Sequence, residues 1–164
     1  GLVNSDDPEG AVWTGSNETG FSIMNTASYN LKDDDIKEMD QEGNLMRKAL
    51  RVCKTVQDFE HFLDTLPRPM RVEANFGVID AYGGAAYYET NNERYYKKDA
   101  NDPNLAPEGY LIYTNFSFEG RTDEGKGYVR YENAKKKCGT KDLLLSVSFS
   151  RLPALFIIAC WISI

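Results

Sequence analysis

The chain of 164 residues has the length and composition of one globular domain, with 41% apolar, 12% aromatic and 27% charged side chains. These proportions exclude a disordered chain, a collagen-like repeat and a disulfide-stapled miniprotein. The formal net charge of -6 leaves no excess of positive charge to neutralise phosphates, so we expect no nucleic-acid partner. Cys53, Cys138 and Cys160 are far apart in sequence, and we expect free, mostly buried thiols.

The first 31 residues predict two short strands, at residues 12–13 and 21–24, joined by a loop that contains Asn17 and Gly20. The acidic segment at residues 33–42 lacks the Gly and the terminal Glu of a calcium-binding EF-hand loop. We therefore interpret it as a solvated loop that leads into a helix.

Apolar residues at helical intervals predict two helices between residues 44 and 66, divided near Lys54. Thr55, followed three residues later by Asp58, is typical of a helix N-cap, and Pro67 ends the second helix. His61 is the only histidine. With no second histidine and no cysteine at ligand spacing, we expect a surface residue and no metal site.

The middle of the chain predicts antiparallel strands separated by short turns, at residues 72–81, 85–90, 94–97 and 110–118. Residues 128–137 have the composition of a helix. Hairpins packed on helices indicate an α+β layer structure.

The segment 143–164 is densely apolar, and Arg151 is its only charged residue. A membrane anchor is disfavoured, because Arg151 and Pro153 leave a run shorter than the roughly 20 residues that a spanning helix needs. A buried strand pair and a segment foreign to the domain, such as a frame-shifted end, both stay open. We divide the chain into a domain at 1–142 and an apolar tail at 143–164, and we expect both ends to be truncated.

No short catalytic motif is present: the sequence lacks GxSxG, HExxH and a Walker loop. Polar residues instead interrupt two predicted strands, at Asn25 and at Thr114-Asn115. A strand asparagine can hold its carboxamide rigidly and aim an N–H at a developing oxyanion. On these grounds alone, an asparagine that satisfies backbone groups is the favoured interpretation.

Four segments, in order, resemble one enzyme group. Residues 76–89 (FGVIDAYGGAAYYE) resemble the strand, Asp-x-x-Gly turn, strand, Glu pattern of the N-terminal nucleophile hydrolases related to choloylglycine hydrolase, penicillin V acylase and isopenicillin N acyltransferase. Residues 15–21 (GSNETGF) are similar to that group's Gly-x-Asn-Glu-x-Gly-Leu segment. Residues 113–116 (YTNF) resemble its Thr-Asn strand, and residues 127–134 (GYVRYENA) resemble the helix start that follows.

The resemblance implies a partial αββα sandwich, with antiparallel sheets and flanking helices, that hydrolyses or transfers an acyl group at a small-molecule linear amide without a cofactor. In that group an amino-terminal cysteine attacks the carbonyl, its own α-amino group handles the proton, and an acyl-thioester forms. Carried over, Asn115 would donate to the oxyanion and Arg130 would help to position the cysteine. Asn17 and Asn25 would supply contacts around the acyl site. Asp80, Gly83 and Glu89 match as fold determinants.

The sequence departs from the group's pattern at two places. No cysteine precedes Asn17, and none of the three cysteines stands in the nucleophile's place. Gly127 stands where the group tends to have serine. We therefore expect a fragment that is inactive alone. Its substrate, its choice between hydrolysis and acyl transfer, a cytoplasmic or exported location and assembly as a homo-oligomer all stay open.

A second hypothesis is a non-catalytic domain whose tyrosines bind carbohydrate or peptide, because a tyrosine offers an apolar face and a polar tip. The candidate residues for that surface are Tyr87, Tyr88, Tyr95, Tyr96, Tyr110 and Tyr113.

Overall fold

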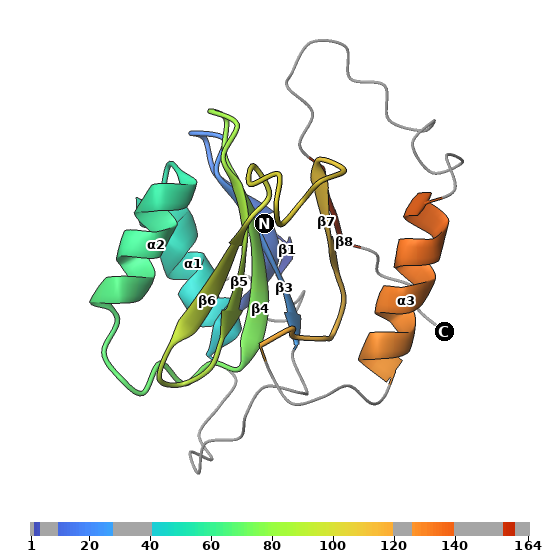
Figure 1. Ribbon diagram of the computed structural model, residues 1–164. Helices are drawn as coiled ribbons and strands as arrows, with labels where there is room; N and C mark the ends of the chain where they lie inside the picture. Colours follow the sequence, from blue (N-terminus) through green and yellow to red (C-terminus); the bar gives the residue numbers. More distant parts are fainter. Residues whose placement is uncertain (1, 4–9, 28–40, 120–125, 140–155, 160–164) are drawn as a thin grey trace.

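The computed structural model describes residues 2–3, 10–27, 41–119, 126–139 and 156–159 (Figure 1). Most of the predicted acidic loop and of the apolar tail lies outside these residues, as do Cys160 and the side chain of Cys138. The sequence-based expectations for those parts stay predictions.

The described residues form layers in the order helices, sheet, strand pair, helix (Figure 1). The sheet has six antiparallel strands in the order β1-β2-β3-β4-β5-β6. Their bounds are Leu2–Val3, Val12–Ser16, Ser22–Ala27, Ala74–Ile79, Ala85–Thr90 and Tyr95–Asp99. The helices are α1 (Glu42–Val52), α2 (Val56–Thr65) and α3 (Lys126–Gly139). This arrangement confirms the prediction of an α+β structure with an antiparallel sheet and flanking helices.

Strands β7 (Tyr110–Tyr113) and β8 (Phe156–Ala159) pair in parallel and form the third layer, so the prediction of antiparallel pairing is wrong for these two strands. β8 lies within the segment described above as an apolar tail, so part of that segment is a strand of this layer. In the part of the chain that the structure describes, no helix is both long and apolar enough to cross a membrane.

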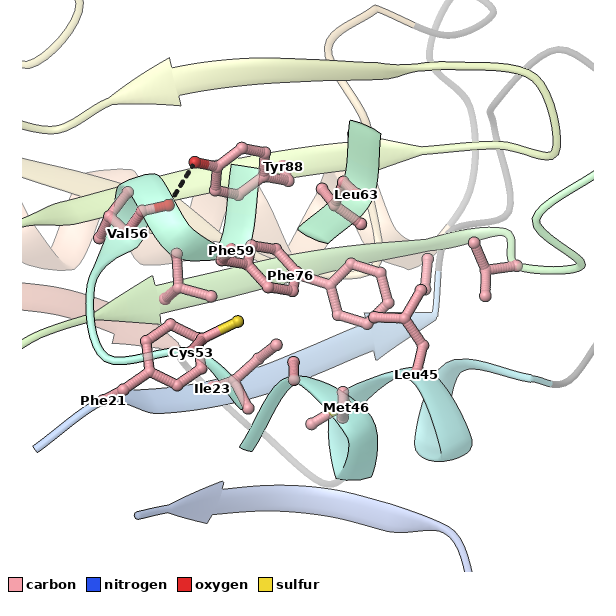
Figure 2. Packing of buried hydrophobic residues seen from close by; sticks show 14 of the residues in the cluster. Phe21, Ile23, Leu45, Met46, Cys53, Val56, Phe59, Leu63, Phe76 and Tyr88 are labelled. Carbon is pink, nitrogen blue, oxygen red and sulfur yellow. Dashed lines mark hydrogen bonds between the residues drawn. The ribbon is translucent and has the colours of Figure 1, made fainter. Parts of the chain in front are cut away.

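Helices α1 and α2 cover one face of the sheet and bury the main core against it (Figure 2). Phe59 of α2 lies at the centre, because its ring contacts those of Phe21, Phe76 and Tyr88 at centroid distances of 5.2 to 6.0 Å. Large apolar side chains dominate protein cores in this way, since burial removes their surface from water.

The two helices are separate, as predicted, and the capping pattern at Thr55 explains why. Thr55 accepts a hydrogen bond from the Asp58 backbone N–H at 3.1 Å, and the Asp58 carboxylate accepts one from the Thr55 N–H at 2.9 Å. This capping box satisfies two of the N–H groups that a helix start leaves unpaired.

The strand predicted over residues 110–118 is wrong beyond Tyr113, where β7 ends. Residues 114–119 continue as an irregular segment, because side chains of the sheet take up its backbone groups. Thr26 donates to the Thr114 carbonyl at 3.0 Å, and Asn75 donates to the Phe116 carbonyl at 2.9 Å. We call residues 114–119 the bridging segment, since it joins the end of β7 to the face of the six-stranded sheet.

Candidate active site

Asn115 and Arg130, the two predicted catalytic residues, lie in contact. The Arg130 guanidinium donates from Nη1 to the Asn115 Oδ1 at 2.8 Å. Asn115 Nδ2 in turn donates to the carbonyl oxygen of Ala27, the last residue of β3, at 3.0 Å. A guanidinium has only donors and a carbonyl only accepts, so these two partners fix which way the carboxamide points.

The Asn115 carboxamide keeps one donor for another group. Its NH₂ carries two N–H bonds, and one of them is used by Ala27. Within the described residues, the second N–H makes no hydrogen bond. A half-buried carboxamide that is held at both ends and keeps one N–H has the form of an oxyanion donor.

Arg130 also has a donor that is available to a further group. Its Nε atom is buried and has no hydrogen-bond partner among the described residues. A buried guanidinium N–H without an acceptor is costly, and it favours a site that an anionic or carbonyl group completes.

Helix α3 reaches this site through a close backbone approach at Gly127. A Cβ atom at Gly127 would overlap the carbonyl oxygen of Asn115. Thr114 Oγ1 donates to the Gly127 carbonyl at 2.9 Å and holds the helix start against the bridging segment. The glycine that departs from the serine of the resembling group therefore has a steric reason in this chain.

Three further side chains of β4 and β5 hold the bridging segment to the sheet; sequence reasoning missed Asn75 and gave Tyr87 a different role. Asn75 and Tyr87 both donate to the Phe116 carbonyl, at 2.9 and 3.0 Å, and Asn75 Oδ1 accepts from Ser117 at 2.7 Å. Glu89 accepts from the Phe118 and Glu119 backbone N–H groups at 2.7 and 2.8 Å. Asn75 and Tyr87 could have been suspected as polar groups inside a strand run.

Asn17 and Asn25, the two predicted substrate contacts, lie apart from this cluster. Asn17 Nδ2 donates to the carbonyls of Leu50 and Cys53 at 3.0 and 2.7 Å. Its Oδ1 accepts from two backbone N–H groups within its own loop, so the carboxamide joins the β2–β3 loop to the end of α1. These contacts hold the loop against the helix, and the substrate contact of Asn17 stays a prediction.

The side chain of Asn25 points to the face of the sheet opposite the bridging segment. In the register of β3 and β4 it stands opposite Phe76, whose ring belongs to the helix-covered core. Its neighbour Thr26 reaches the bridging segment, and successive strand side chains point to opposite faces.

Cys53 has the properties of a core residue and not of a nucleophile. It is buried, forms no disulfide and packs in the main core, which confirms the expectation of a free thiol at this position. Burial, with a smaller contribution from the Asp58 charge, raises the pKa of the Cys53 thiol to about 12. The reactive thiolate is therefore scarce at neutral pH.

A pocket of about 370 Å³ lies beside the bridging segment. Its wall combines β7 with Phe118 of the segment and Tyr131, which follows Arg130 on α3. Lys98 and Lys135 contribute its basic groups. Pockets of this size and apolar lining are typical sites for small molecules.

Two further expectations concern metal binding and the tyrosine surface. They hold no group of three or more His, Cys, Asp or Glu side chains that could bind a metal ion. His61 is exposed on α2, as expected. Of the six tyrosines proposed for a binding surface, Tyr87, Tyr88 and Tyr113 are buried.

No protein-family model matches the chain, and no curated protein sequence matches it. Among solved structures it is similar to two variants of a conjugated bile acid hydrolase from Clostridium perfringens. With one variant the identity is 19%, over 62% of this chain and 34% of that chain, at a TM-score of 0.42. With the other variant the identity is 15%, over 93% of this chain and 43% of that chain, at a TM-score of 0.45. The chain thus spans less than half the length of these enzymes.

Proposed function

We propose that this chain is part of the catalytic domain of a hydrolase or acyltransferase that acts on small-molecule linear amides, with Asn115 as oxyanion donor. The observation that carries the proposal is the carboxamide of Asn115. Arg130 and Ala27 hold it at both ends, and one N–H is left for a substrate. A donor fixed in advance stabilises the oxyanion of a tetrahedral intermediate without reorganisation during the reaction.

Arg130 has two roles in the proposal. It orients Asn115 through the Oδ1 contact, and its positive charge adds to the stabilisation of an oxyanion. Its buried Nε is a donor for a further group of the complete site, which includes the nucleophile.

The nucleophile in this proposal is the amino-terminal cysteine that the family resemblance implies. No cysteine precedes Asn17 in this sequence, so the proposal assigns that residue to a segment outside the 164 residues. The thiolate would attack the amide carbonyl and release the amine, and the thioester would then pass its acyl group to water or to another amine. The oxyanion forms in both steps, so Asn115 would act twice.

The test compares the chain alone with the chain joined to its encoded upstream segment. Penicillin V, conjugated bile salts and N-acyl amino acids serve as substrates. We expect no turnover by the chain alone and turnover by the extended protein. In the extended protein, Asn115→Ala should lower kcat on the order of 100-fold to 1,000-fold, as loss of one oxyanion donor does.

The matched control is Asn133→Ala, which removes an exposed asparagine of α3 and should leave kcat unchanged. Circular dichroism and urea unfolding would show that both variants fold. Turnover by the chain alone would show that the nucleophile is misplaced, and near-normal turnover of the Asn115→Ala variant would remove Asn115 from the site.

A further inference from the structure

We propose that Glu89 is a positioning residue, whose buried carboxylate holds the bridging segment and thereby sets the place of the Asn115 side chain. The role of Asn115 in catalysis rests on the proposed function above. The control of its position by Glu89 is a separate claim, and it is tested by a readout that needs no turnover.

The first support is the geometry of Glu89. Its side chain has no exposed surface. Its two oxygens accept separately, Oε1 from the Phe118 N–H at 2.7 Å and Oε2 from the Glu119 N–H at 2.8 Å. One carboxylate therefore satisfies two consecutive backbone donors of an irregular segment, which has no ladder to satisfy them.

The second support is the place of these contacts along the chain. The bridging segment is held at its start by Thr26 on Thr114, in its middle by Asn75 and Tyr87 on Phe116, and at its end by Glu89. Glu89 stands directly opposite Asn75 in the β4–β5 register, so the middle and end contacts come from one place on the sheet. If the contact with Glu89 is lost, the end of the bridging segment is free to shift, and the shift displaces Asn115 in the same segment.

The third support is the need for a carboxylate in particular. A buried charge is costly unless hydrogen bonds satisfy it, and burial raises the pKa of Glu89 while the two N–H bonds oppose that rise. The charged and titratable groups around it are Lys98 of β6, Glu119 of the segment, Tyr87 of its own strand and Tyr113 of β7. Glutamine has the same shape but offers one acceptor, and its NH₂ would face a backbone N–H.

Strand β5 also provides a matched control. Thr90 is equally buried, and its Oγ1 donates to the Ala74 carbonyl at 2.7 Å. It neighbours Glu89 and therefore points to the helix-covered face, away from the bridging segment. Thr90→Val removes one buried hydrogen bond from the same strand without touching that segment.

The experiment is NMR of the ¹⁵N-labelled chain, which follows the Asn115 side-chain amide and the Phe118 and Glu119 backbone amides. In Glu89→Gln we expect the Asn115 Nδ2 resonances to shift, and exchange at Phe118 and Glu119 to accelerate by about 10-fold relative to the β4–β5 ladder. In Thr90→Val we expect the Asn115 resonances to stay in place and any loss of protection to be spread over the sheet.

A pH titration of the unmodified chain gives a second readout. Protonation converts one accepting oxygen of Glu89 to a hydroxyl, so the Asn115 side-chain resonances should follow the titration of the Glu89 carboxyl, and Glu89→Gln should abolish this dependence. Asn115 resonances that change neither with the substitution nor with pH would overturn the proposal. So would equal effects of the two substitutions. If Glu89→Gln does not fold, the titration of the unmodified chain decides alone.

Because the readout is position, an inactive extended protein would refute the proposed function and leave this inference standing. Asn115 resonances that stay in place would refute this inference and leave the proposed function standing.

Discussion

Gly127 lies so close to Asn115 that no side chain fits between its Cα and the Asn115 carbonyl oxygen. This contact lets the start of α3 reach the bridging segment, and it places Arg130, one turn further along, beside the Asn115 carboxamide. The absence of a side chain at Gly127 is therefore a condition for the Asn115–Arg130 pair.

Gly127→Ala should destabilise the protein, although alanine is the better helix former by about 1 kcal/mol. The added methyl must push the Asn115 carbonyl away and loosen the Arg130 contact. Urea unfolding measures the change, and Asn133→Ala, an exposed substitution on the same helix, should be neutral or slightly stabilising. A more stable Gly127→Ala variant would show that the two segments can separate without loss.

Asn17→Asp should destabilise the protein by about 2 kcal/mol or more, because it places a carboxylate against the carbonyls of Leu50 and Cys53. Chemical unfolding at neutral pH checks this. The control, Asn44→Asp, changes an exposed residue in the first turn of α1, where a negative charge is favourable. Unchanged stability of Asn17→Asp would contradict the stabilising role that these contacts give to Asn17.

Asp80→Asn should detach the β4–β5 turn from α2. The Asp80 carboxylate accepts from the Val56 N–H at the start of α2 and from the Tyr82 and Gly84 N–H groups of the turn, at 2.8 to 2.9 Å. Asparagine keeps one acceptor oxygen, so we expect a loss of about 1–3 kcal/mol. Hydrogen exchange should show the loss at the Val56 amide first, whereas Asp102→Asn, in a surface loop, should leave that amide protected.

Cys53 should make the protein less stable as the pH rises above the ordinary value of a thiol. The folded chain holds the Cys53 proton up to a pKa of about 12, whereas the unfolded chain releases it earlier. Between the ordinary pKa of a thiol and a pH of about 12, ionisation of Cys53 should lower the free energy of unfolding by up to about 1.4 kcal/mol per pH unit. Below the ordinary thiol pKa, the stabilisation by the protonated thiol is fully present.

The difference between the unmodified chain and Cys53→Ala, measured by urea unfolding across this pH range, isolates the contribution from those of tyrosine and lysine. A parallel pH dependence in the two proteins would contradict the prediction. The native thiol should also react slowly with a disulfide reagent and rapidly once urea unfolds the chain.

The first helices and hairpins could be predicted because local signals decide them. Thr55 and Asp58 mark a helix start within four residues, and the alternation around Phe76 and Tyr88 marks strands with one strongly apolar face. The same signals failed beyond Tyr113. The run up to Phe118 is rich in strand-forming residues, but partners that are distant in sequence, such as Thr26 and Asn75, bind its backbone and end the strand.

The candidate site was predictable only in part, for the same reason. The family resemblance named Asn115 and Arg130 for two separate roles, and the structure shows a contact between them that the sequence did not predict. The roles of Asn17, Asn75 and Glu89 depend on which backbone groups lie opposite them in space. Nothing in the local sequence around Glu89 indicates that it binds two N–H groups about 30 residues away.

Strands β4 and β5 have two chemically different faces, and this difference protects their alignment. One face carries Phe76 and Tyr88 into the helix-covered core, and the other carries Asn75 and Glu89 toward the bridging segment. A slip of one residue would exchange the faces, so that aromatic rings would meet backbone donors while amide and carboxylate groups entered an apolar core. Because both errors would occur together, the contacts that place Asn115 also exclude the misaligned sheet.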